Sequence, residues 1–157
     1  MAYVPIVPYA DETYADAYLA QRLGTDAWNN ASSGDKQKAL AEATRLIDLV
    51  PIVGVKYDEE QEREFPRDVD EGGEVPAEVQ DACCEVALAL LQGRTLDQLS
   101  ASVGVSSEST GDASVSYTGE RGGLALVDES YGLPSPTAAS LIAPWIADRS
   151  EIDLTRV

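Results

Sequence analysis

Residues 75–93, VPAEVQDACCEVALALLQG, carry the strongest structural signal in the chain. Pro76 suits the first position of a helix, and Gly93 suits the residue just beyond its last turn. Acidic side chains in the first turns favour the positive end of a helix dipole. Apolar residues recur at helical spacing through Val79, Ala82, Cys83, Val86, Ala87, Leu90 and Leu91. We therefore expect this segment to be the central, most buried helix.

Two further helices are predicted on the N-terminal side. Residues 12–23 follow Asp11 as a candidate cap, precede Gly24 as a stop, and place Leu23 in an apolar stripe. Residues 34–49 have the clearest apolar periodicity in the chain and end at Pro51. The link between them, residues 25–34, is predicted to be rich in turns and to hold Trp28.

The remaining segments divide the chain around this helical body. Residues 51–75 are predicted to be irregular and strongly acidic, with Phe65 as their apolar anchor. Residues 102–123 are rich in Ser, Gly and Thr, but Ala113–Thr118 alternates like a strand. From Leu133 the sequence predicts a last helix, with Ser135 as its cap and Pro144 as a kink or end.

The fold class expected is mainly α, a small helical bundle with a flexible β-hairpin-like segment and extended arms at both termini. The boundaries are an N-terminal arm over 1–10, a helical body over 11–101, a flexible partly β segment over 102–132, and a C-terminal helix and tail over 133–157. A chain of 157 residues is long enough for one such domain.

Composition excludes several classes of function. The chain has 28 acidic and 11 basic residues, no histidine, and a net charge of −17, and its basic residues are scattered. Proteins that bind DNA phosphates need clustered cations, and histidine-dependent catalysis or metal binding needs imidazole. Glycine-rich phosphate loops are also missing from the sequence. We expect no enzyme activity, no catalytic residue, no metal and no cofactor.

The two cysteines, Cys83 and Cys84, are adjacent in the predicted central helix. Neighbouring cysteines rarely have relaxed disulfide geometry, so we expect buried free thiols in a reducing compartment. We expect no signal peptide and no membrane-spanning segment, because no apolar run approaches the length of a bilayer.

Nine residues are candidates for a partner or oligomer interface. Leu141, Ile142, Trp145 and Ile146 would form a large apolar patch if exposed, which either the chain's own body or a partner must cover; we favour a partner. Val115 and Tyr117 would pair with a strand of another chain or within a hairpin. Phe65 anchors its loop on the core or on a partner. Arg67 and Tyr131 complete the set.

The order of the segments resembles that of the small head–tail adaptor proteins (connectors, or head-completion proteins) of tailed double-stranded DNA bacteriophages. The resemblance rests on TYADAYLAQRLG, Trp28, KQKALAEATRLID, Phe65-Pro66-Arg67, VPAEVQDACCEVALALL, GDASVSYTG and LIAPWI. It implies a structural virion protein in the phage neck, found in the host cytoplasm during assembly. It also implies a ring, commonly of twelve copies, that docks under the portal protein, extends the genome channel and offers a surface to the next tail or stopper protein. DNA would pass through without specific binding.

The same opening and the Phe-Pro-Arg element also resemble DnaT-like single-stranded-DNA-binding proteins, which implies a role in replication. We rank this alternative second, because the charge of the chain opposes binding to phosphates. Another virion or host interaction module is a third possibility.

Overall fold

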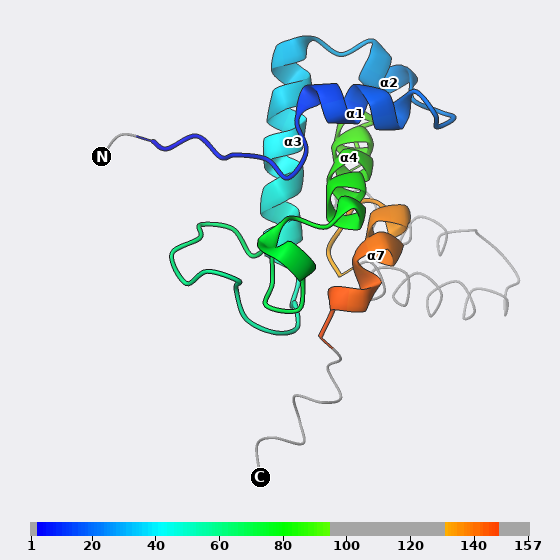
Figure 1. The fold of residues 1–157 in the computed structure, drawn as a ribbon. Helices are drawn as coiled ribbons and strands as arrows, with labels where there is room; N and C mark the ends of the chain where they lie inside the picture. Colours follow the sequence, from blue (N-terminus) through cyan, green and yellow to red (C-terminus); the bar gives the residue numbers. More distant parts are fainter. Residues whose placement is uncertain (1–2, 95–130, 148–157) are drawn as a thin grey trace, which may run out of the picture.

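The computed structural model describes residues 3–94 and 131–147. Within these ranges the chain is mainly helical, as the sequence predicts, and β-pairing is confined to two isolated bridges. The predicted β-hairpin-like segment and the C-terminal tail lie outside the described residues. Figure 1 shows the helices gathered around α4, with the N-terminal segment reaching away from them.

Helix α4, Ala77–Leu91, is the centre of the fold. Residues 82–89 are all buried, including both free cysteines. Helices α1, α2, α3 and α7 all pack against α4, which confirms its predicted central position. Pro76 is the N-cap of this helix and not its first helical residue, because its backbone is still extended. The helix therefore begins one residue later than predicted.

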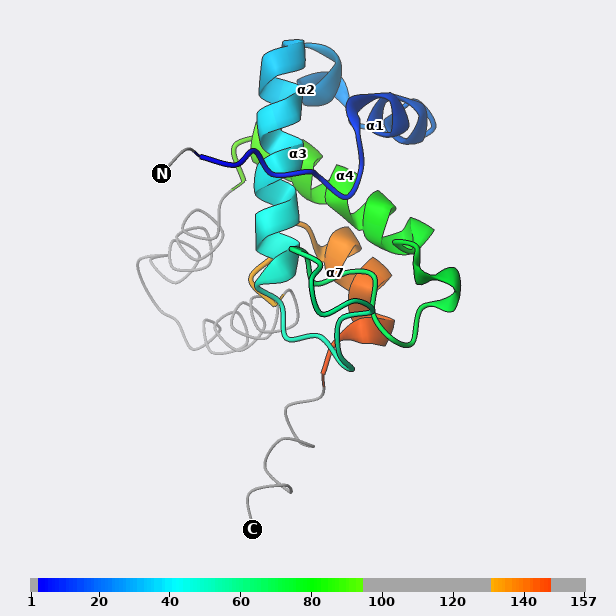
Figure 2. The ribbon, with the colours of Figure 1, turned by 60° about the vertical axis from the view of Figure 1, so that its left-hand side comes forward.

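Helix α3, Ser33–Asp48, makes the most extensive contact with α4, and the two run in roughly opposite directions (Figures 1 and 2). Ser32 caps it by accepting the backbone N–H of Asp35 at 3.2 Å. Thr44 is buried in the contact, where its hydroxyl lies 3.5 Å from the Cys83 sulfur. The periodicity of the sequence therefore located this helix to within a residue at each end.

Helix α1, Glu12–Leu19, is shorter than predicted. Asp11 caps it through the backbone N–H of Tyr14 at 2.7 Å, but regular α-helix ends four residues before Leu23. Leu23 then lies in the turn region and is 91% exposed, so its predicted place in a buried stripe is wrong. The link that follows contains a short helix that the sequence did not predict, α2, Asp26–Asn29, which buries Trp28.

Helix α7, Pro136–Ile142, continues into a short 3-10 helix, η2, Ala143–Trp145. Ser135 caps α7 by accepting the backbone N–H of Ala138 at 3.2 Å, as predicted. Leu133 and Ile142 are fully buried, and α7 packs along α4. The chain's own body therefore covers most of the apolar face of this helix.

The acidic loop, residues 51–75, has no long element but is not shapeless. It contains the short 3-10 helix η1, Glu71–Gly73, and an antiparallel bridge between Lys56 and Arg67. A second bridge joins Ile52 to Ile146, just after η2. The N-terminal segment, residues 3–10, has no helix or strand and crosses in front of α3 in Figure 2.

Candidate functional site

Phe65 lies inside the protein, between the N-terminal segment and the end of the α7–η2 unit. Its ring makes edge-to-face contacts with Tyr9 and Trp145, at centroid distances of 5.8 and 5.9 Å. Such pairs add to the stabilisation from burial alone. Phe65 is 2% exposed, so its side chain anchors the acidic loop to the chain's own core and is not available to a partner in this structure.

Arg67 is the hub of the acidic loop. Its guanidinium donates to the backbone carbonyl oxygens of Val53 at 3.0 Å and Glu64 at 3.2 Å, and also to that of Gly54. It forms an ion pair with the Glu64 carboxylate at 2.7 Å. The planar guanidinium group has five donors, so one buried arginine can fix several turns of backbone at once. The Arg67 side chain is buried, so it stabilises the loop from inside the protein and is not exposed to a partner.

Asp48, at the end of α3, joins the N-terminal segment to this loop. Its carboxylate accepts a hydrogen bond from the Tyr9 hydroxyl, and the Arg63 guanidinium lies 3.5 Å from the same carboxylate. The Tyr9 hydroxyl in turn accepts the backbone N–H of Phe65 at 3.2 Å. Burial raises the pKa of Asp48 despite these donors, and burial together with the Asp48 carboxylate raises the pKa of Tyr9.

The C-terminal candidates are divided between core and surface. Ile142 is fully buried, whereas Tyr131, Leu141, Trp145 and Ile146 are partly buried and pack against the core. Val115 and Tyr117 lie outside the described residues. The structure therefore brings Phe65, Arg67 and Trp145 together in contacts within the chain. An interface role for the partly buried residues stays a prediction.

A polar seam connects α1 to α4. The Tyr14 hydroxyl donates to Asp81 at 2.7 Å, and one turn further along the Tyr18 hydroxyl donates to Glu85 at 2.9 Å. Arg22 also pairs with Glu85, which is almost completely buried. Desolvation and the neighbouring carboxylates raise the pKa of both tyrosines, so both hydroxyls remain donors at neutral pH.

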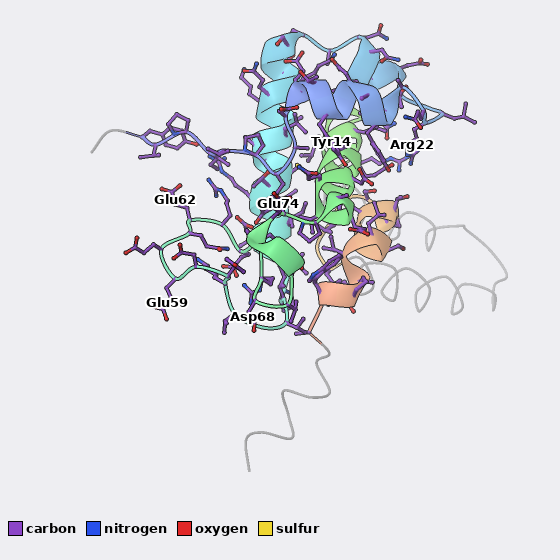
Figure 3. The ribbon with its side chains drawn as sticks, viewed as in Figure 1. Tyr14, Arg22, Glu59, Glu62, Asp68 and Glu74 are labelled. Carbon is purple, nitrogen blue, oxygen red and sulfur yellow. The ribbon has the colours of Figure 1, made fainter. Side chains whose placement is uncertain are left out.

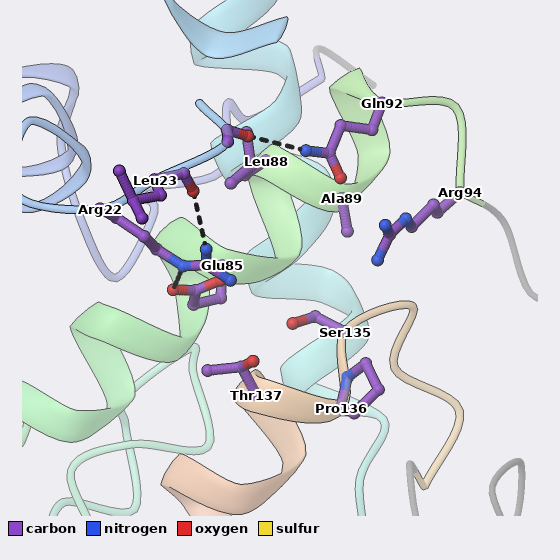
Figure 4. Close-up of a pocket in the computed structure, with 11 residues that line it drawn as sticks. Arg22, Leu23, Glu85, Leu88, Ala89, Gln92, Arg94, Ser135, Pro136 and Thr137 are labelled. Atoms are coloured by element: carbon purple, nitrogen blue, oxygen red, sulfur yellow. Dashed lines mark hydrogen bonds and ion pairs between the residues drawn. The ribbon is translucent and has the colours of Figure 1, made fainter. Parts of the chain in front are cut away.

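Figure 4 shows the cavity beside this seam, between α4 and the start of α7. Its volume is about 210 Å³, and its lining includes Arg22, Glu85, Arg94 and Thr137. Gln92 closes one side by donating to the Gly24 carbonyl oxygen at 3.1 Å. Because Tyr18 and Arg22 already bind Glu85, this carboxylate connects the α1 region to α4 and is not free to bind a ligand in the cavity.

Most of the basic side chains in the part of the chain that the structure describes are paired with carboxylates. Of the eight that fall within the described ranges, six form ion pairs at distances up to 3.9 Å: Arg22, Lys36, Lys38, Lys56, Arg63 and Arg67. Lys36 also lies 5.0 Å from the centroid of the Trp28 ring, in cation–π geometry.

Within residues 3–94 and 131–147, no three His, Cys, Asp or Glu side chains gather in a way that could hold a metal ion. None of the helices in that part of the chain is long and apolar enough to cross a membrane.

Comparison with known proteins places the chain in one family. Residues 8–156 match the family described as "Putative DnaT-like ssDNA binding protein", and the chain belongs to that family. No curated protein and no solved structure matches it. This membership supports the second of the two resemblances found in the sequence, and it does not establish the head–tail adaptor identity ranked first.

Proposed function

We propose that this member of the family works by binding proteins, as a head–tail adaptor subunit of a tailed phage. In this role copies of the chain form a ring, of about twelve subunits as the resemblance implies, beneath the portal. The ring extends the genome channel and receives the next tail or stopper protein. The proposal includes no catalytic step, cofactor or metal.

The observation that carries the proposal is the state of the basic side chains. Affinity for nucleic acid depends on cations that neutralise phosphates and release counterions. Here six of the basic side chains are already engaged by carboxylates of the same chain, which has a net charge of −17. A surface of this kind repels a duplex, which suits a channel wall along which DNA must slide.

Exposed apolar residues on irregular segments also support a protein-binding role. Tyr3, Val4 and Val7 on the N-terminal segment are all exposed, as are Val55 and Tyr57 on the acidic loop. Such residues gain free energy when a protein partner removes them from water.

The second candidate function is binding of single-stranded DNA, and the family description favours it. Proteins of this kind stack bases on exposed aromatic rings along a cationic groove. Tyr3 and Tyr57 are exposed rings in the part of the chain that the structure describes. Trp28 is buried and Trp145 is half-buried, so they are poor stacking platforms.

Two measurements on the full-length protein separate the candidates. In a fluorescence anisotropy titration with labelled single-stranded and duplex oligonucleotides at physiological salt, we expect no saturable binding below about 100 µM. In a mass measurement of the protein mixed with the portal of the same phage, we expect a complex carrying a ring of copies. Submicromolar DNA binding with a steep salt dependence, and no portal complex, would establish the second candidate and overturn the first.

A further inference from the structure

Two stretches of the acidic loop pair and give it an inner and an outer side. The Tyr57 backbone N–H donates to Pro66 at 3.1 Å, and the Asp68 N–H donates to Val55 at 2.9 Å, on either side of the bridge between Lys56 and Arg67. Side chains alternate between the two sides of paired extended backbone. Lys56 and Arg67 turn inward towards Glu64, and Val55 and Tyr57 are therefore directed outward.

The outward residues are exposed but held in place. Val55 is 65% exposed and Tyr57 is 56% exposed. The Tyr57 ring lies so close to Gly73 that a Cβ there would come within 2.6 Å of it. Asp68 likewise covers Gly54, where a Cβ would come within 2.3 Å of its Oδ1 atom, and accepts the Val55 backbone N–H at 3.0 Å.

These contacts hold the Tyr57 and Asp68 side chains and the Val55 backbone in place, unlike those of a freely solvated loop. Both glycines have positive φ, +76° at Gly54 and +66° at Gly73, a conformation that glycine adopts without strain. Exposed side chains that are already fixed lose little conformational entropy on binding, which is the usual property of interface anchors. Tyrosine is a preferred residue for such positions.

Charge identifies the chemistry of the partner. The three cations of the loop, Lys56, Arg63 and Arg67, are paired with carboxylates of the same chain. The carboxylates that the loop exposes are Asp58, Glu59, Glu60, Glu62, Asp68 and Glu74. Figure 3 shows Glu59 and Glu62 at the outer edge of the loop, directed away from the helices. A nucleic acid, and the same acidic face on a second copy of the chain, carry the same sign of charge and are repelled from this face, so contacts between copies in a ring would use other surfaces.

We propose that Val55, Tyr57 and Asp68 form a docking surface for a basic and apolar segment of a different protein. An arginine of that segment packs on the Tyr57 ring and pairs with Asp68, while its apolar residues cover Val55. The inference deepens the proposed function by locating one protein-binding face, and it rests on that function only for the need of a protein partner.

The test uses NMR amide spectra of the isotope-labelled full chain, titrated with a short synthetic peptide in which arginine and leucine alternate with serine. We expect saturable shifts concentrated at the amides of residues 54–57 and 67–69. Replacing the arginines of the peptide by glutamate, or its leucines by serine, should abolish these shifts. Shifts spread evenly over the acidic surface, or no binding at all, would overturn the proposal.

Matched variants check which residues carry the binding. Tyr57→Ala should weaken peptide binding about tenfold, whereas Tyr3→Ala, at a ring that is 71% exposed elsewhere, should leave it unchanged. Asp68→Asn keeps the acceptor for Val55 but removes the charge, and Glu42→Gln on α3 is its control. Equal effects of each pair would contradict the proposal. Peptide binding at this face without a portal complex would leave the inference intact and reject the adaptor function.

Discussion

Trp145 and Asp70 are joined by a hydrogen bond across 75 positions of sequence: the indole N–H of Trp145 donates to Asp70 Oδ1 at 2.9 Å. The other carboxylate oxygen accepts the backbone N–H of Arg67 at 2.6 Å. One nearly buried carboxylate therefore ties the end of the α7–η2 unit to the hub of the acidic loop. The loop and the C-terminal part of the described chain should lose stability together.

Trp145→Phe tests this tie. The substitution keeps a ring against Phe65 but removes the indole donor, leaving one oxygen of Asp70 without its partner. We expect the free energy of unfolding in urea to fall by about 1–2 kcal/mol. Tyr3→Phe should cause little change, because the hydrogen bond that it removes, from Arg45 to the Tyr3 hydroxyl, is exposed to water. A Trp145→Phe variant as stable as the wild type would show that the bond contributes nothing to folding.

Val86→Asp tests the central position of α4. Val86 is fully buried, so an aspartate there would be an unpaired charge in the core and should cost several kcal/mol, comparable with the whole ~5–15 kcal/mol of a typical domain. Leu90→Asp, at a partly buried position of the same helix, should cost less. The measurement is thermal unfolding followed by circular dichroism. A cooperative transition near the wild-type midpoint for Val86→Asp would place α4 at the periphery.

Local signals in the sequence predicted the helices that local interactions define. The apolar repeat of α3, the Ser135 cap and the apolar face of α4 each depend on residues within a few positions of one another. The end of α1 and the whole of α2 were predicted wrongly or missed. Helix α2 accompanies the burial of Trp28 beside α4, a contact that no local pattern encodes.

The loop contacts could be predicted only in part. The sequence identified Phe65 and Arg67 as special, but not that Tyr9 and Trp145 enclose the one and that carbonyl oxygens surround the other. Apart from Glu64, three residues before Arg67, these partners lie more than ten positions away along the chain. The alternation of Val55, Lys56 and Tyr57 was available as a strand-like signal, but three residues are too few to separate it from irregular structure.

Asp48 should make stability depend on pH in an unusual direction. Burial raises its pKa above 3.8, so between 3.8 and the raised value the folded state binds more protons than the unfolded state. The contribution of Asp48 to the free energy of unfolding therefore falls as pH rises through that window. In urea unfolding at a series of pH values, the stability of the wild type relative to Asp48→Asn should therefore fall as pH rises above 3.8. A difference independent of pH would exclude the raised pKa.

Asp16 is the matched case of opposite sign. The indole N–H of Trp28 donates to its carboxylate at 2.7 Å and is the main cause of a lowered pKa, with Lys36 contributing in the same direction. The folded state therefore binds fewer protons, and the stability that Asp16 contributes is present above its ordinary pKa of 3.8 and lost as pH falls through the lowered value. The advantage of wild type over Asp16→Asn should shrink on acidification below 3.8. A difference that grows on acidification would contradict the assignment.

The last prediction concerns the C-terminal helix, for which the sequence left the chain's own body and a partner as alternative covers. In the structure Ile142 is fully buried and α7 lies along α4, while the bridge from Ile146 to Ile52 holds the acidic loop. Truncation after Leu133 would expose the α4 surface that α7 covers, so we expect a chain that unfolds or precipitates, measured by circular dichroism and by sedimentation. A chain that ends at Ala147 keeps every one of these contacts and should remain folded. If the chain truncated after Leu133 stays folded and soluble but no longer joins the portal, the helix is a docking element and its packing on α4 is not needed for the fold.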